Sequence, residues 1–117
     1  MAKVTVYEKP TCTTCRKLIT LLAEHGVDPE RIDYHVTGLT EDRVRDLLAK
    51  TGAAPHELLR RREPLVKERG LGPDTDPEEL IALMVEHPAL LERPVVVVGD
   101  RAVLARPIER ALALLEG

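Results

Sequence analysis

The N-terminal part of the chain changes from a two-residue period of hydrophobic positions to a helical one. Val4 and Val6 alternate with more polar neighbours, which is typical of a half-buried strand. From Cys12 to Gly26 the apolar positions follow a 3.6-residue period, so a helix is expected to begin at Cys12. Residues 31–36 show a second strand pattern. A strand, a helix and a strand predict a parallel βαβ unit with a right-handed crossover.

The middle of the chain carries helical patterns with start and stop signals. Thr40 is expected to cap a helix that ends at Gly52, because acidic residues follow the cap and a buried stripe follows them. Residues 55–69 are expected to be helical, with a proline at the first position. Asp76 is expected to cap another helix, which Pro88 follows.

The last third returns to strand patterns. Residues 95–98 are an unbroken run of valine, as expected for a strand that is covered on both faces. Residues 99–100 form a hairpin turn signal before a strand at 102–105, and Pro107 opens a final helix. The whole order predicts an α/β fold with a four-stranded mixed sheet and a helical insertion at about residues 40–87.

Length and composition limit the classes of function. With 117 residues, of which 44% are hydrophobic, we expect a single domain over residues 1–117 with its own core. No apolar run approaches the ~18 residues of a membrane span and no signal-peptide pattern precedes the first strand, so we expect a soluble, cytoplasmic protein. The net charge of −3 and the 2% of aromatic residues argue against nucleic acid, and neither nucleic acid nor a membrane is expected as a partner.

The cysteine pair is the clearest sign of chemistry. Cys12 and Cys15 lie where the first helix is expected to begin. The free N–H groups and the positive dipole end of a helix N-terminus favour an anion, so the pKa of Cys12 is expected below the usual ~8.5 of a free thiol. Lys9 and Arg16 add positive charge nearby. A disulfide between the two cysteines would close a very small loop and add little stability, which favours a redox or nucleophilic role.

Two other readings of the cysteines have less support. A zinc site needs four ligands, and no second cysteine pair is present. The histidines are scattered, without the spacing of a zinc motif, at His25, His35, His56 and His87. We therefore expect no metal, and inert thiols remain the other alternative.

Four short motifs resemble those of one family in the same order. They are PTCTTCR at residues 10–16, LLRRREP at 58–64, HPALLERPV at 87–95 and ARP at 105–107. Together they resemble the arsenate reductase family of the glutaredoxin-related type and its relatives, the Spx regulators. The resemblance covers nearly the whole chain and implies a thioredoxin-like fold.

The resemblance also implies an oxyanion site. In that family the nucleophile is a cysteine at the position of Cys12, and three arginines hold the anion, which match Arg60, Arg93 and Arg106. Arginine suits this task because it offers several donors and stays charged at any relevant pH. Arg16 is a further candidate for binding the substrate, whereas Arg61 and Arg62 are interpreted as solvated charges. Pro94 would be the cis proline that this fold places beside the active thiol.

Three departures from the family affect the mechanism. Glu8 and Lys9 stand where family members commonly have His-Asn, so the pKa of Cys12 must depend on the helix N-terminus, Arg16 and the anion-binding arginines. Cys15 stands where the arsenate reductases usually lack a thiol and the Spx regulators have one. No aromatic residue precedes Cys12 and no proline separates the cysteines, which makes a general disulfide reductase less favoured.

The resemblance and these departures predict thiol-dependent reduction of arsenate to arsenite, with arsenate or a similar oxyanion as the bound ligand. Cys12 would form a covalent adduct and Cys15 would resolve it to a disulfide, which glutaredoxin or thioredoxin would reduce. No tightly bound cofactor is expected, and glutathione or another small thiol would be the co-substrate. Two alternatives stay open: a Spx-like redox-sensing regulator that binds RNA polymerase, and a paralogous thiol oxidoreductase with another substrate.

Overall fold

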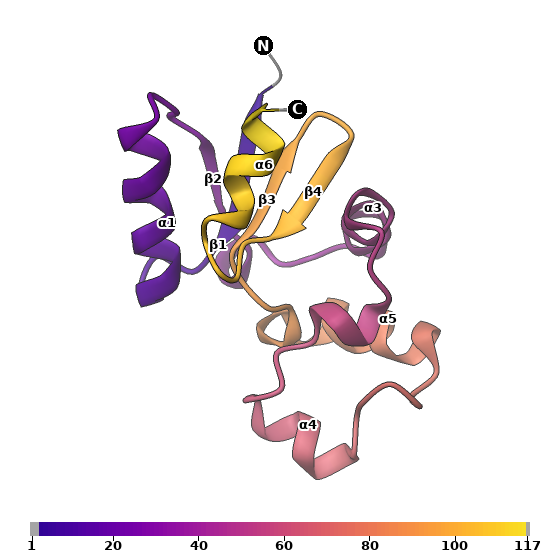
Figure 1. Cartoon of the computed structure of the whole chain (residues 1–117). Helices are drawn as coiled ribbons and strands as arrows, with labels where there is room; N and C mark the ends of the chain where they lie inside the picture. Colours follow the sequence, from indigo (N-terminus) through magenta and orange to yellow (C-terminus); the bar gives the residue numbers. More distant parts are fainter. Residues whose placement is uncertain (1–2, 117) are drawn as a thin grey trace. The chain divides into compact units, whose positions relative to one another are not determined.

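The computed structural model of the chain describes residues 3–116. Its residues form two compact units (Figure 1). The first unit combines the two ends of the chain, Met1–Thr37 and Arg93–Gly117, and the second is the middle segment, Gly38–Glu92. The cysteines belong to the first unit.

The first unit contains a mixed sheet of four strands in the order β2-β1-β3-β4 (Figure 1). β1 (Val4–Glu8) pairs in parallel with β2 (Glu30–Asp33) and antiparallel with β3 (Val95–Val98). β4 (Arg101–Leu104) pairs antiparallel with β3. The predicted α/β fold with a βαβ unit and a ββ hairpin is therefore confirmed.

Two helices pack on one face of this sheet, α1 (Thr13–Glu24) and α6 (Arg110–Glu116). Side chains alternate between the two faces of a strand, and helical positions three or four apart share one face of a helix. The resulting core contains Val4, Val6 and Val96 from the sheet, Leu18 and Leu22 from α1, and Ala111 and Leu114 from α6. This packing fixes the N-terminus of α1 beside the end of β1.

Three boundaries in the first unit differ from the sequence prediction. The second strand ends at Asp33, and Tyr34–Thr37 form the short helix α2 in place of the predicted strand end. The Asp33 carboxylate accepts a hydrogen bond from the backbone N–H of His35 at 3.1 Å, a local bond that competes with strand pairing.

The other two differences lie near the C-terminus. The hairpin turn places β4 at Arg101–Leu104, one residue earlier than predicted, because Arg101 pairs directly with Val98. The final helix begins at Arg110, later than Pro107, since the residues between them form single turns, such as the bond from the Arg110 N–H to the Pro107 carbonyl at 3.1 Å.

The second unit is helical, and its predicted caps are present. The Thr40 hydroxyl accepts a hydrogen bond from the backbone N–H of Arg43 at 3.1 Å, and Asp76 accepts one from Glu78 at 3.0 Å. Gly52 ends the first helix of the unit in the left-handed conformation, with φ of 69°. The elements are α3 (Glu41–Thr51), the 3-10 helix η1 (Pro55–Leu58), α4 (Pro64–Arg69), α5 (Pro77–Glu86) and the 3-10 helix η2 (Pro88–Leu90).

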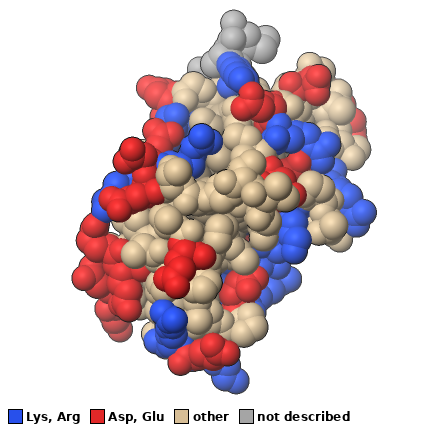
Figure 2. All heavy atoms as spheres, turned by 180° about the vertical axis from the view of Figure 1, so that it is seen from behind, with Lys and Arg blue, Asp and Glu red and all other residues tan. Residues whose placement is uncertain are grey.

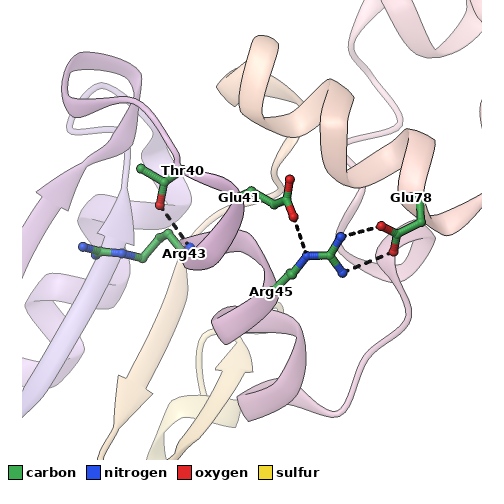
Figure 3. A network of polar contacts seen from close by, with 5 residues as sticks. All are labelled: Thr40, Glu41, Arg43, Arg45 and Glu78. Atoms are coloured by element: carbon green, nitrogen blue, oxygen red, sulfur yellow. Dashed lines mark hydrogen bonds and ion pairs between the residues drawn. The ribbon is translucent and has the colours of Figure 1, made fainter.

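Arg45 links two helices of this unit (Figure 3). Its guanidinium donates to Glu41 on α3 at 2.9 Å and to both carboxylate oxygens of Glu78 on α5. All three side chains are exposed, so this network contributes little to stability and mainly orients the facing helix surfaces.

The predicted helix over residues 55–69 is wrong as a continuous element. Leu59 pairs with Leu91 in an isolated antiparallel bridge, which two backbone hydrogen bonds flank, from Arg60 to Leu90 at 2.7 Å and from Glu92 to Leu58 at 2.8 Å. Pro64 lacks an N–H and would clash with a preceding helical turn, so it begins a new helix. The helical pattern is therefore divided between η1 and α4.

The surface carries both signs of charge. On the face in Figure 2, both acidic and basic side chains are exposed. Among residues 3–116, no helix is long and apolar enough to cross a lipid bilayer.

We expect the packing of α1 on the sheet to dominate the stability of the first unit. Leu22 is fully buried in the core, and Leu22→Ala should lower the free energy of unfolding by about 2–5 kcal/mol because it leaves a cavity. Leu21→Ala, at the adjacent half-buried position, should cost less. Urea denaturation measures both, and equal losses would contradict the observed orientation of α1.

Candidate active site

Cys12 lies where β1 gives way to α1. It is the N-cap residue of α1, with extended backbone angles, and its carbonyl accepts the first helical hydrogen bond from Arg16 at 3.0 Å. A turn precedes it, closed by the bond from the Cys12 N–H to the Lys9 carbonyl at 2.8 Å. Cys12 is half-buried, Cys15 is fully buried, and both are free thiols. The predicted helix N-terminal position of Cys12 is confirmed.

The environment of Cys12 favours its thiolate. Burial alone would raise the pKa of Cys12, but interactions with the backbone N–H and thiol of Cys15, the guanidinium of Arg93 and the backbone N–H of Thr14 outweigh burial and lower the pKa. The first N–H groups of α1 thus stabilise the Cys12 thiolate, and the positive end of the helix dipole acts in the same direction. A thiolate is the nucleophilic form of cysteine.

Cys15 has the opposite character. Burial raises the pKa of Cys15 to about 12, and the negative charges of Cys12 and Glu8 act in the same direction, whereas the backbone N–H of Lys9 partly opposes them. Two cysteines one turn apart on α1 therefore differ strongly in acidity. At neutral pH Cys12 is the available nucleophile and Cys15 is a protonated neighbour.

Arg93 brings a positive charge to Cys12. Arg93 is 6% exposed and is the first residue of the chain after the second unit. Its peptide bond to Pro94 is cis, in agreement with the cis proline predicted there. Burial lowers the pKa of Arg93, but interactions with Tyr34 and Cys12 outweigh this effect and raise the pKa. Its Nη1 lies 3.4 Å from Nε2 of His35. A buried cation is stable only when such partners accompany it.

Arg106 is anchored to the same segment. Its Nε donates a hydrogen bond to the carbonyl oxygen of Arg93 at 2.7 Å, and the side chain is half-buried. The Arg106–Pro107 peptide bond is also cis. The first unit therefore joins Cys12, Arg93 and Arg106 through a short series of contacts.

The remaining predicted arginines have other surroundings. Arg60 belongs to the second unit, where its side chain is 14% exposed and pairs with Glu92 at 2.6 Å and with Glu63 at 3.6 Å. Arg16 is exposed on the first turn of α1, and Arg61 and Arg62 are exposed as expected for solvated charges.

The sequence prediction missed three residues around the thiols. Tyr34 and His35 contact Arg93 from α2, although residues 31–36 were assigned to a strand. Glu8 is 1% exposed and pairs with Arg31 of β2. The alternation of β1 placed Glu8 on the same face as Val4 and Val6, and this signal could have predicted its burial.

This arrangement suits attack on an electrophile that carries negative oxygens. It combines an acidic thiol, helix N–H groups and a buried guanidinium, which stabilise negative charge near the sulfur. Within residues 3–116, no cluster of three or more His, Cys, Asp or Glu side chains has the arrangement of a metal site.

Comparison with known proteins gives a consistent result. The sequence model of the ArsC family matches residues 7–114. The chain is 39% identical to the Escherichia coli protein YfgD, over 97% of each chain, and 33% identical to an arsenate reductase of Neisseria meningitidis, over 98% of this chain and 100% of that one. Its fold is similar to that of an arsenate reductase from Vibrio cholerae, with a TM-score of 0.90 and 32% identity over 97% of this chain and 98% of the other.

The acidity of the two thiols can be compared by alkylation. At pH 6, iodoacetamide should modify Cys12 well before Cys15, because the pKa of Cys12 is lowered and that of Cys15 is raised to about 12. With rising pH the rate at Cys12 should level off above its pKa, while the rate at Cys15 continues to rise. Peptide mapping by mass spectrometry measures both rates, with Cys12→Ser and Cys15→Ser as references. Equal rates at pH 6 would show that Cys12 is not activated.

Proposed function

Because the chain belongs to the ArsC family, we propose that it is an enzyme that reduces arsenate to arsenite with electrons from thiols. The observation that carries this proposal is the Cys12 thiol of lowered pKa, which interacts with both the N-terminus of α1 and the buried Arg93. An anionic nucleophile that attacks an anionic substrate needs such positive charge to reduce their repulsion.

Cys12 begins the reaction. Its thiolate attacks arsenic(V), an arsenate oxygen leaves as water with protons from solvent, and a covalent sulfur–arsenic bond forms. Arg93 and Arg106 hold the remaining oxygens, and both are carried by the segments around Pro94 and Pro107. Since guanidinium groups bind oxyanions through paired N–H donors, they orient the arsenic towards the sulfur. The proposal gives Arg16 a lesser role, because its side chain is exposed.

Arg60 is proposed as the third arginine on the strength of the family resemblance. In the second unit its guanidinium pairs with Glu92 and Glu63, which compete with any anion for the same donors. Removing its side chain should therefore weaken anion binding less than removing that of Arg93, which interacts with the Cys12 sulfur.

Cys15 completes the reaction. Its sulfur attacks the Cys12 sulfur of the adduct, a disulfide forms and arsenite leaves with the two electrons. Glutaredoxin or thioredoxin then reduces the disulfide, with glutathione or another small thiol as co-substrate. The proposed cycle uses no tightly bound cofactor or metal, and it requires neither nucleic acid nor a membrane.

The two cysteines should respond differently to substitution. Cys12→Ser should abolish arsenite formation with every reductant, because no adduct forms. Cys15→Ser should lose activity driven by thioredoxin but keep part of the activity at high glutathione, since the small thiol can attack the adduct from solvent without the high effective concentration of a neighbouring side chain. Arsenite is measured directly during turnover of the purified protein.

A single turnover without reductant gives an independent result. Mass spectrometry should show the wild-type protein two hydrogens lighter, the mass change of one disulfide. Full activity of Cys15→Ser with every reductant would assign the reaction to Cys12 alone, and no arsenite from the wild type would overturn the proposed activity.

The arginines can be tested by anion binding. Arg93→Ala and Arg106→Ala should weaken arsenate or sulfate binding by about 1.5–3 kcal/mol each, the cost of one lost charge-assisted hydrogen-bonding partner. Arg60→Ala should fall at or below the lower end of this range. Isothermal titration calorimetry measures the affinities, and Arg93→Lys shows whether charge alone suffices if Arg93→Ala unfolds.

Exposed neighbours provide matched controls for this series. Arg61→Ala and Arg62→Ala remove the same charge from the segment that carries Arg60. Losses as large as those at Arg93 would mean that general surface charge, and not the proposed trio, attracts the anion.

A further inference from the structure

Glu8 is a buried carboxylate to which the proposed reaction cycle assigns no role. It is the last residue of β1 and is 1% exposed. Its Oε2 accepts a bond from Nε of Arg31 on β2, while its Oε1 is buried and has no hydrogen-bond partner among the described residues. An ionised oxygen in this position is costly unless it interacts with a proton donor during function.

The packing of β1 against α1 places Glu8 near Cys15. Val4, Val6 and Glu8 alternate along one face of β1, and Cys15, Leu18 and Leu22 form the buried face of α1. The valines of this row pack with the two leucines in one core cluster. α1 runs in the opposite direction to β1. Along the strand, the residue after Val4 and Val6 on the same face is Glu8, and along the helix the buried residue before Leu22 and Leu18 is Cys15, so Glu8 and Cys15 face each other.

Two further observations support this placement. The backbone N–H of Lys9, the residue after Glu8, interacts with the Cys15 sulfur, and the charge of Glu8 raises the pKa of Cys15. The other charged or titratable groups that act on Cys15 are Cys12 on α1 and Arg31 on β2. Glu8 is thus the described carboxylate that acts on this thiol.

Cys15 needs a base to act as a nucleophile. Its pKa is raised to about 12, so the thiol is protonated at pH 7. The helix N–H groups that favour the Cys12 thiolate do not activate Cys15, because Cys15 lies inside the helix and is fully buried.

We propose that Glu8 is the general base of the resolving step, which takes the proton of Cys15 as its sulfur attacks Cys12. The Cys15 S–H bond breaks and the bond between the two sulfurs forms, while the bond from Cys12 to its leaving group breaks. In arsenate reduction the electron pair of that bond stays on arsenic, which changes from arsenic(V) to arsenic(III), and the two sulfurs are oxidised to the disulfide. The proton on Glu8 passes to solvent when the product leaves.

Arg31 is the positioning residue of this pair. It occupies Oε2 of Glu8 and leaves Oε1 for the thiol proton. Its side chain is 44% exposed, so water can solvate the guanidinium when Glu8 becomes neutral. The Glu8→Gln variant should therefore fold, because glutamine has nearly the same shape as glutamate and water can solvate the Arg31 guanidinium.

The inference rests on the proposed role of Cys15, but it can be tested without arsenate. The aromatic disulfide dithiobis(nitrobenzoate) reacts with Cys12 to form a mixed disulfide and releases one coloured thionitrobenzoate. Attack of Cys15 on the Cys12 sulfur of this mixed disulfide then releases a second. Stopped-flow absorbance should therefore show two phases in the wild type and only the first in Cys15→Ser. A wild type without the second phase would overturn the proposal for both Cys15 and Glu8, whatever its activity towards arsenate.

Glu8→Gln should leave the first phase unchanged and slow the second by about a hundredfold or more at pH 7, the low end of typical general-base contributions. The second phase of the variant should then rise about tenfold per pH unit, because it depends on free thiolate, while that of the wild type should rise less steeply. Glu8→Asp should restore part of the rate. Glu24→Gln removes an exposed carboxylate from the end of α1 and should change neither phase.

Whether Glu8→Gln slows or accelerates the second phase distinguishes a general base from a negative charge that only raises the pKa of Cys15. If Glu8 acted only as a negative charge, Glu8→Gln would lower the pKa of Cys15 and accelerate the second phase. An accelerated or unchanged second phase would therefore overturn the assignment. Thermal unfolding and the unchanged first phase establish that the variant is folded.

Discussion

The packing of α1 against β1 is the constraint on which the chemistry of this protein depends. The apolar row of the strand and the buried stripe of the helix meet in one core, and this contact fixes the first turn of α1 at the end of the strand. Cys12 is the residue at which the chain changes from one element to the other. Partial positive charge at the helix N-terminus therefore acts on the sulfur without any additional structure. A different register between α1 and the sheet would remove both the buried position of Cys15 and its proximity to Glu8.

The same helix gives its two thiols opposite acidities, which sets the order of the proposed reaction. Cys12 receives N–H groups and the guanidinium of Arg93, so its anion is favoured. Cys15 is surrounded by the core and by negative charge, so its proton is retained. The first thiol can thus attack a substrate while the second stays unreactive until a sulfur beside it becomes electrophilic. Because Cys15 retains its proton, the proposed general base is Glu8, which is buried at the end of β1.

The arginines differ in how their charges are balanced. Arg93 is buried among Tyr34, His35 and Cys12, and it lowers the pKa of the Cys12 thiol. Its charge therefore acts at the sulfur that the proposed reaction uses. Arg60 already has carboxylate partners, so a substrate has to compete for it.

The sequence by itself determined the order of the strands, the helix caps at Thr40 and Asp76 and the position of Cys12 at a helix N-terminus, because period, caps and motifs are local signals within one segment. It also identified the ArsC family resemblance, which the comparisons bear out. Tertiary structure alone decided that Tyr34, His35 and Glu8 join Arg93 around the two thiols. His35 meets Arg93 across 58 positions of sequence, and Glu8 meets Arg31 across 23, through strand order and register. Such contacts leave no local pattern, since each residue type is equally compatible with an exposed position, and burial by a distant segment gives it a function.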